Sequence, residues 1–215
     1  MALEVCEIFS SIQGESTHTG RPCTFIRLAG CNLDCSYCDT AYARGPGRPF
    51  TVESLVGKVI EIGCPLVEIT GGEPLLQQET PALALALIET GHTVLVETNG
   101  SLDIDDLDIR CIIIMDIKCP ASGQEQMNDY ANLDRLKPHH QVKFVVTDRN
   151  DYEFARNLLA ARSIAVQPGN IVFSAVHGKL NPARLAAWIL EDHLFNVRLQ
   201  VQLHRILWPD TERGV

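Results

Sequence analysis

The sequence of 215 residues has no uninterrupted apolar run that approaches the roughly 18 residues needed for a membrane-spanning helix. Its beginning, MALEVCEIFS, has neither the basic segment nor the apolar core of a signal peptide. Internal repeats, low-complexity stretches and Ser/Gly-rich linkers are also missing. These absences predict a single domain over residues 1–215, located in the cytoplasm and not associated with a membrane.

Positive charge is scarce, because 18 Lys and Arg residues stand against 27 Asp and Glu residues, for a net charge of −9. This balance counts against a protein that coats nucleic acid or binds an anionic membrane surface. Hydrophobic residues make up 46% and charged residues 21%, which is typical of a globular protein. We therefore expect a compact core and no nucleic-acid partner, while a local basic pocket stays compatible with the charge.

Eight cysteines are unusual in a chain expected to lie in a reducing compartment, where structural disulfides are rare. Cys31, Cys35 and Cys38 form a C-x3-C-x2-C pattern in the segment GCNLDCSYCDT, so one loop can present three thiolates to a metal centre. The chain has no second C-x2-C or His pair to complete a closed zinc site. An iron–sulfur cubane held by three cysteines would keep one iron open for a small molecule. The pattern alone leaves a zinc loop and a cluster both open. Burial in the core, as small apolar residues, is predicted for Cys6, Cys23, Cys64, Cys111 and Cys119.

Short runs rich in Ile, Val and Leu alternate with longer amphipathic segments along the chain. The short runs predict strands over 24–29, 66–70, 93–97, 111–118, 141–146, 171–174 and 197–202. The segments between them predict helices over 52–62, 80–90, 151–162 and 181–193. This alternation indicates parallel strands joined by right-handed crossovers. An open doubly wound sheet and a partial barrel both fit, and both place an active site at the carboxyl ends of the strands.

The cysteine segment, with Tyr37 before its last cysteine, resembles the cluster loop of radical S-adenosylmethionine enzymes. In such enzymes S-adenosylmethionine binds the open iron, and its one-electron cleavage generates a 5′-deoxyadenosyl radical. The segment TGGEP at 70–74 resembles their GGEP element, where glycines let the backbone approach the methionine group of the cofactor. The resemblance implies an α/β fold: a partial, TIM-like barrel of parallel strands with outer helices.

The N-terminal segments IFSSIQGE and TFIRL narrow the resemblance to the 7-carboxy-7-deazaguanine synthase family. Ser16 stands where that family usually has glycine. Arg27 can grip a carboxylate, and Gln13 and Glu15 can read the donor and acceptor edge of a pterin. The substrate contacts that the resemblance implies, including one from a tail that tucks into the active site, are Ile12, Gln13, Gly14, Glu15, Arg27, Thr70 and Val215.

The same resemblance implies contacts to S-adenosylmethionine and to Mg²⁺. Thr40, after Cys38 and Asp39, is the implied Mg²⁺ ligand, although it is also suited to cap the following helix. Asp116 and Lys118 also fit an ordinary ion pair at a strand end. The implied cofactor contacts are Tyr37, Cys38, Asp39, Gly72, Glu73, Thr98, Asn99, Asp116, Ile117, Lys118, Ser174, Ala175, Val176 and His177.

The implied reaction contracts the ring of 6-carboxy-5,6,7,8-tetrahydropterin to give 7-carboxy-7-deazaguanine, with loss of ammonia. It belongs to queuosine biosynthesis, whose product feeds a modified tRNA base or another 7-deazapurine. The implied cofactors are one 4Fe–4S cluster, S-adenosylmethionine and Mg²⁺, and the implied partners are a flavodoxin or ferredoxin electron donor and a second copy of the chain. Two alternatives are a glycyl-radical enzyme activase, which shares the cysteine spacing but does not need the QGE segment, and a non-enzymatic zinc-binding module.

Overall fold

The computed structural model describes residues 2–215, which form one sheet in the order β3-β1-β2-β4-β5-β6-β7-β8-β9. The strands are β1 (Leu3–Ile12), β2 (Pro22–Leu28), β3 (Arg48–Phe50), β4 (Leu66–Gly71), β5 (Thr93–Thr98), β6 (Ile112–Ile117), β7 (Gln141–Val146), β8 (Ile171–Ala175) and β9 (Val197–Gln200). The helices are α1 (Val52–Ile62), α2 (Thr80–Glu89), α3 (Asn132–Arg135), α4 (Arg149–Ala161), α5 (Pro182–Glu191) and α6 (Leu203–Leu207). Short 3-10 turns are η1 (Ala41–Arg44), η2 (Pro74–Leu76), η3 (Pro120–Ser122) and η4 (Glu125–Met127).

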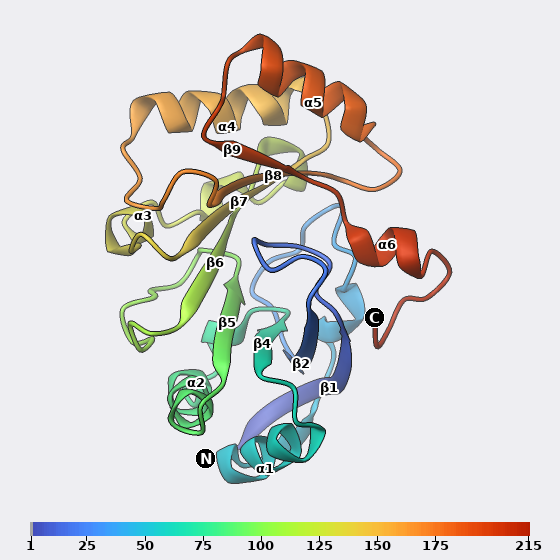
Figure 1. Ribbon diagram of the computed structural model, residues 1–215, viewed down its shortest axis with the longest axis vertical. Coiled ribbons are helices and arrows are strands. Elements are labelled where there is room, and N and C mark those ends of the chain that lie inside the picture. The colour runs from blue at the N-terminus through green and yellow to red at the C-terminus, as the bar shows by residue number, and fades with distance from the viewer. Residues whose placement is uncertain (1) are drawn as a thin grey trace.

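The seven predicted strands pair in parallel, from β2 through β4 to β9, and the helices between them lie outside the sheet (Figure 1). The sheet curves without closing, so the partial barrel is confirmed. Each predicted strand and helix was placed within two residues of its observed bounds. Their apolar periodicity is strong because one face of each packs in the core.

Two strands were not predicted, and both are antiparallel: β1 pairs with β2 and with β3. The sequence of β1 does not alternate cleanly, because a register shift between Val5 and Glu7 interrupts its pairing with β2. Cys6 lies in this bulge and is only partly buried, and so is Cys64, after α1. The prediction of core burial is therefore wrong for these two cysteines and confirmed for Cys23, Cys111 and Cys119.

The two faces of the sheet carry different side chains, and β4 shows the division. Val67 and Ile69 point outward into the main core under the helices. Leu66 points inward and belongs to a smaller apolar cluster with Phe25 and Leu95. Because successive side chains alternate between the faces, Glu68 also points inward, above this cluster. The interior is therefore apolar at its base and polar toward the carboxyl ends of the strands. No helix in the described part of the chain has the length and apolar character to cross a membrane.

A buried histidine, His140, precedes β7 and is 3% exposed. Its Nδ1 accepts a hydrogen bond from the backbone N–H of Lys137 at 3.1 Å, and its Nε2 has no partner among residues 2–215. Burial, helped by the neighbouring His139, lowers the pKa of His140 to about 4, from 6.5 in a free histidine. Between pH 6.5 and 4, His140 therefore binds a proton more readily in the unfolded chain than in the folded chain.

We predict that His140 reduces the free energy of unfolding by about 2 kcal/mol as the pH falls from 6.5 to 4. Urea unfolding of the wild type and of His140→Gln across this pH range measures the effect. The contribution is present above pH 6.5 and is lost toward pH 4, so the variant should show the shallower pH dependence. Equal slopes for the two proteins would contradict the assignment.

Candidate active site

A cavity of about 340 Å³ opens at the carboxyl ends of the strands, within the size range of small-molecule sites. Its wall combines the loop after β1, the cysteine loop after β2, the ends of β4 to β7, the loop after β8 and the tail after β9. The structure brings most of the predicted site residues to this wall: Ile12, Gln13, Gly14, Glu15, Arg27, Cys31, Cys35, Tyr37, Cys38, Asp39, Thr40, Thr70, Gly72, Thr98, Asn99, Asp116, Lys118, Val176, His177 and Val215.

The three cysteines of the loop are free, partly buried thiols that face the same cavity. Burial raises the pKa of Cys35, and the ammonium group of Lys118 opposes this shift. Within residues 2–215, no three His, Cys, Asp or Glu side chains form a group suited to a single metal ion. A zinc ion needs its thiolates about 2.3 Å away, whereas a cubane takes its thiolates at separate corners. The three thiols line one cavity wall, as three ligands of one cluster would.

Two glycines of the TGGEP segment press β4 against the cysteine loop. The backbone N–H of Glu73 donates to the carbonyl oxygen of Gly30 at 2.8 Å, and that of Gly72 donates to the carbonyl oxygen of Leu28 at 3.2 Å. A Cβ atom on Gly72 would overlap the Gly30 carbonyl, and one on Gly71 would overlap Leu28. Glycine is therefore required here by close backbone approach.

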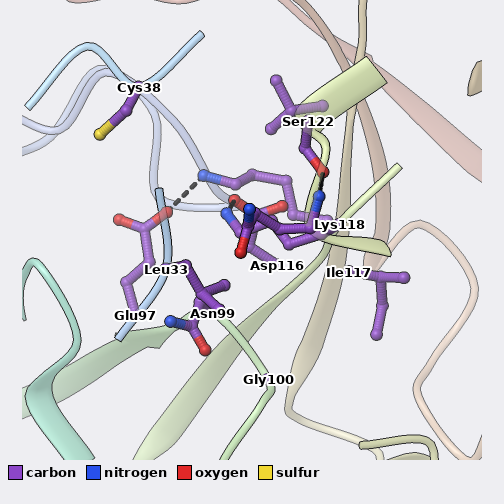
Figure 2. Close-up of polar contacts among 12 residues, drawn as sticks. Leu33, Cys38, Glu97, Asn99, Gly100, Asp116, Ile117, Lys118 and Ser122 are labelled. Carbon is purple, nitrogen blue, oxygen red and sulfur yellow. Dashed lines mark hydrogen bonds and ion pairs between the residues drawn. The ribbon is translucent and has the colours of Figure 1, made fainter. Parts of the chain in front are cut away.

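The side chains of Asp116 and Lys118 form an ion pair at the end of β6, with Lys118 Nζ 2.7 Å from Asp116 Oδ2. Burial lowers the pKa of Lys118, but Asp116 and Cys35 raise it above its usual value, so the ammonium stays charged. Glu97 and Asn99 lie beside this pair (Figure 2). Asp116 Oδ1 is buried on the cavity wall and has no partner within residues 2–215. The ion pair expected as the ordinary alternative is present, and its spare oxygen suits a ligand hydroxyl, such as those of the ribose of S-adenosylmethionine.

Glu73 lies behind the cavity wall. Its carboxylate accepts hydrogen bonds from Thr98 Oγ1 at 2.8 Å and from the backbone N–H groups of Asn99 at 2.7 Å and Leu75 at 3.0 Å. It therefore ties the ends of β4 and β5 together and starts the η2 turn. A direct contact to the cofactor stays a prediction for this residue.

Three other predicted cofactor contacts do not line the cavity. Ile117 points away from Asp116 and Lys118 and packs in the main core (Figure 2). Ala175 also belongs to that core, and Ser174 is fully buried in β8. Ile117 lies between Asp116 and Lys118, and Ser174 and Ala175 precede Val176, which are residues that do line the cavity. The cofactor contacts of these three residues stay predictions.

Sequence reasoning did not identify Lys143, a buried cation in the middle of β7. Its Nζ lies 2.7 Å from Glu15 Oε2 and forms a second ion pair with Glu97. Burial lowers the pKa of Lys143, but Glu15 and Glu97 raise it well above its usual value. Burial likewise raises the pKa of Glu97, and Lys143 brings it below its ordinary value. A lysine within the apolar run QVKFVV was the available signal, because such a charge is rarely buried without partners.

Arg27 projects from β2 into the cavity, and the Nε edge of its guanidinium is already paired with a protein carboxylate. Its Nε donates to Glu7 Oε1 at 2.8 Å, and the same oxygen accepts a hydrogen bond from the hydroxyl of Tyr42. The guanidinium also stacks 5.7 Å from the ring centre of Phe9. Within residues 2–215 its two Nη groups have no hydrogen-bond partner, so they can hold a ligand carboxylate in bidentate fashion.

Thr40 precedes the η1 turn, but its hydroxyl makes no capping hydrogen bond. The alternative role as a helix cap is therefore wrong. Its Oγ1 lies 3.8 Å from Cys38 Sγ on the cavity wall. An oxygen in this position can serve as a ligand to a hard cation.

The chain end closes one side of the cavity by packing on the loop after β1. The backbone N–H of Leu203 donates to the carbonyl oxygen of Gly14 at 3.1 Å, and Gln202 Nε2 donates to Glu15 Oε1 at 3.0 Å. His204 and Arg205 reach Asp39 at 3.7 and 3.6 Å. Partial burial opposes ionisation of Asp39, but the hydrogen bond from His204 and the charge of Arg205 lower its pKa to about 2. The resemblance implied a tail that tucks into the active site, but it did not name these contacts with Asp39 and the loop after β1.

Ser16, which replaces the glycine usual in the family, adopts a left-handed conformation with φ of 65°. Its backbone N–H donates to Gln200 Oε1 at 3.0 Å, and its carbonyl oxygen accepts from Gln200 Nε2 at 2.8 Å. Two hydrogen bonds from β9 therefore offset the strain that a non-glycine residue carries in this region.

Comparison with known proteins identifies the family. A model described as the Radical SAM superfamily matches residues 25–109. The chain is 44% identical over 216 residues to the 7-carboxy-7-deazaguanine synthase of Chlorobaculum tepidum, covering 99% of this chain and 97% of the relative. It is 39% identical to that of Koribacter versatilis, covering 99% and 100%. The chain belongs to the 7-carboxy-7-deazaguanine synthase family.

Solved structures agree on the fold of this family. The crystal structure of QueE from Escherichia coli matches with a TM-score of 0.78 at 24% identity, over 95% of each chain. Streptococcus suis SuiB matches with a TM-score of 0.60 at 16% identity, over 82% of this chain and 47% of that one. Membership of the superfamily implies a 4Fe–4S cluster and S-adenosylmethionine as cofactors. A glycyl-radical activase and a zinc module are not favoured.

We predict that Gly14→Ala reduces turnover at least tenfold, because the new Cβ atom would overlap the ring of His204 and push the tail off the cavity. Limited proteolysis should show faster cleavage near α6 in the variant. Gly57→Ala, where a Cβ atom meets nothing within 4 Å, is the matched control and should behave like the wild type. Unchanged turnover in Gly14→Ala would show that the tail tolerates displacement.

Proposed function

We propose that this chain converts 6-carboxy-5,6,7,8-tetrahydropterin to 7-carboxy-7-deazaguanine, with ring contraction and loss of ammonia, in queuosine biosynthesis. The observation that carries the proposal is one cavity whose wall holds three thiols of a radical S-adenosylmethionine loop together with Arg27 and the QGE segment. The names of relatives that align over almost the full chain support the same activity.

Substrate binding follows from the polar groups on the wall. The free Nη groups of Arg27 suit the substrate carboxylate, and the loop at 12–15 faces the heterocycle. Thr70, from the end of β4, and Val215, from the tail, line the same space. Their closure over the substrate excludes water from the reacting atoms.

Cys31, Cys35 and Cys38 would hold the 4Fe–4S cluster, and the Asp116–Lys118 pair with the backbone at Gly72 would hold S-adenosylmethionine. When bound, these groups supply the radical chemistry that abstracts hydrogen from the substrate. The protein orients the substrate toward them, keeps Lys118 charged beside the cofactor carboxylate and keeps solvent out. No side chain is assigned as an obligatory acid or base.

Three finer features belong to the same proposal. Thr40 Oγ1 would hold a Mg²⁺, which would orient the substrate carboxylate, because Mg²⁺ prefers oxygen ligands and binds few protein groups. A flavodoxin or ferredoxin would donate the electron. The enzyme would act as a cytoplasmic homodimer, and its product would enter the synthesis of a modified tRNA base.

Replacing Cys31, Cys35 or Cys38 with Ala should abolish the brown colour of anaerobically reconstituted protein and reduce turnover below detection, because each removes a cluster ligand. Iron and sulfide analysis and a turnover assay measure both effects. Cys64→Ala, a free cysteine outside the cavity, is the control and should keep the cluster. Wild-type protein that cleaves S-adenosylmethionine but leaves the carboxy-tetrahydropterin unchanged would refute the proposed reaction.

Replacing Thr40 with Ala should raise the KM for the carboxy-tetrahydropterin roughly tenfold or more and remove stimulation by Mg²⁺. Thr40→Ser keeps the hydroxyl and should keep both properties. Turnover measured with Mg²⁺ and with chelator distinguishes the variants. Equal stimulation of Thr40→Ala and the wild type would place the metal elsewhere.

A further inference from the structure

Glu68, in the middle of β4, is a buried acid that the proposed mechanism does not use. It is 3% exposed, and its side chain lies on the cavity wall. Its register partners on the neighbouring strands are Phe25 and Leu95, which both belong to the inner apolar cluster. The carboxyl group therefore stands at the floor of the cavity, where the apolar base meets the polar upper part. An acid at this depth is costly unless a partner compensates for it.

The protein supplies Glu68 with little compensation. Gln13 Nε2 donates a hydrogen bond to Glu68 Oε2, while Gln13 Oε1 accepts from the backbone N–H of Glu15 at 2.9 Å. The amide of Gln13 is thus engaged in holding Glu68 and the loop, which limits what it can offer to a substrate. Glu73, on the same segment, accepts from three protein donors and lies off the cavity wall. The two acids therefore differ: Glu73 bonds to the protein itself, whereas Glu68 faces the cavity.

The charges around Glu68 make the floor rich in hydrogen-bond acceptors. Lys143 is shared by Glu15 and Glu97, so this trio carries a net negative charge. Burial, together with Glu97, raises the pKa of Glu68 well above its usual value, and Lys143 and Arg27 oppose the shift only in part. Glu68 and Glu97 both line the cavity, so their carboxyl oxygens add hydrogen-bond acceptors to its floor. Such a floor attracts N–H donors and repels carbonyl oxygens.

We propose that Glu68 determines substrate specificity by accepting hydrogen bonds from the 2-amino and N3–H edge of the pyrimidinone ring. The inference rests on the proposed function, because it places the heterocycle of that substrate over Glu68 while Arg27 holds its carboxylate. A 2-amino-4-oxopyrimidine presents two adjacent donors, which match acceptor oxygens at the floor of the cavity. A ring with a 2-oxo group would set an acceptor against Glu68 and be rejected, because a buried polar group would lose its partner.

The test measures binding, so it does not depend on the metal cluster. Fluorescence titration of the purified protein with pterin-6-carboxylate and with lumazine-6-carboxylate compares a 2-amino ring with a 2-oxo ring. The wild type should bind the pterin about 10- to 100-fold more tightly, the range expected for one or two buried hydrogen bonds. Glu68→Leu should reduce this ratio to below about threefold. Glu68→Gln keeps a carbonyl acceptor and should retain most of the preference.

Controls separate specificity from a structural role. Glu61→Leu, the same replacement on the exposed face of α1, should keep the wild-type ratio. Thermal unfolding of every variant reports stability, and a folded Glu68→Leu protein with an unchanged ratio would overturn the proposal. If Glu68→Leu is too unstable to titrate, equal pterin and lumazine affinities in Glu68→Gln would overturn it instead.

The outcome also distinguishes this inference from the proposed function. A wild-type enzyme that turns over the carboxy-tetrahydropterin but shows no preference for the 2-amino ring refutes the role of Glu68 alone. A wild type that neither binds pterin-6-carboxylate nor turns over the carboxy-tetrahydropterin refutes the proposed function, and the role of Glu68 with it.

Discussion

The ammonium group of Lys143 joins parts of the chain that would otherwise repel one another. It connects Glu15, in the loop after β1, to Glu97, at the end of β5, across the interior of an open sheet. Without this cation two partly buried carboxylates would face each other, which would destabilise the fold. The loop that Lys143 holds carries Gln13 and Gly14, and the tail packs on that loop in turn. The cavity therefore depends on one buried charge in β7.

This dependence explains why an acidic protein can present both cations and hydrogen-bond acceptors to an anionic substrate. The net charge of −9 belongs to the whole chain, whereas the cavity holds cations at two levels. Arg27 and Lys118 stand where carboxylates of the substrate and of the cofactor are proposed to bind. Below them, Lys143 is paired with the carboxylates of Glu15 and Glu97, so the floor of the cavity stays rich in hydrogen-bond acceptors. In this proposal the site recognises a ligand at both ends, because Arg27 binds its anionic end and Glu68 accepts hydrogen bonds from its donor end.

Local signals predicted much of this fold and site, and their limits are physical. The parallel strands and the helices between them have strong periodicity because one face of each is buried. β1 was missed because a bulge breaks its alternation, and α6 because five residues are too few to show a helical period. The cysteine loop and TGGEP are compact motifs, so a short window contains them. Lys143 and Glu68 were missed because their partners lie far away in the sequence, as the separation of 128 positions between Glu15 and Lys143 illustrates.

The glycines at the end of β4 have a consequence for how this enzyme can change. Gly71 and Gly72 touch the backbone of Leu28 and Gly30 directly, so the position of the cysteine loop is set by main-chain contact. Side chains at the floor, such as Glu68, take no part in that contact. Substitutions there can alter which ring the cavity accepts without moving the loop that carries the radical chemistry. Directed evolution toward new heterocycles should therefore vary side chains at the floor of the cavity and leave Gly71 and Gly72 unchanged.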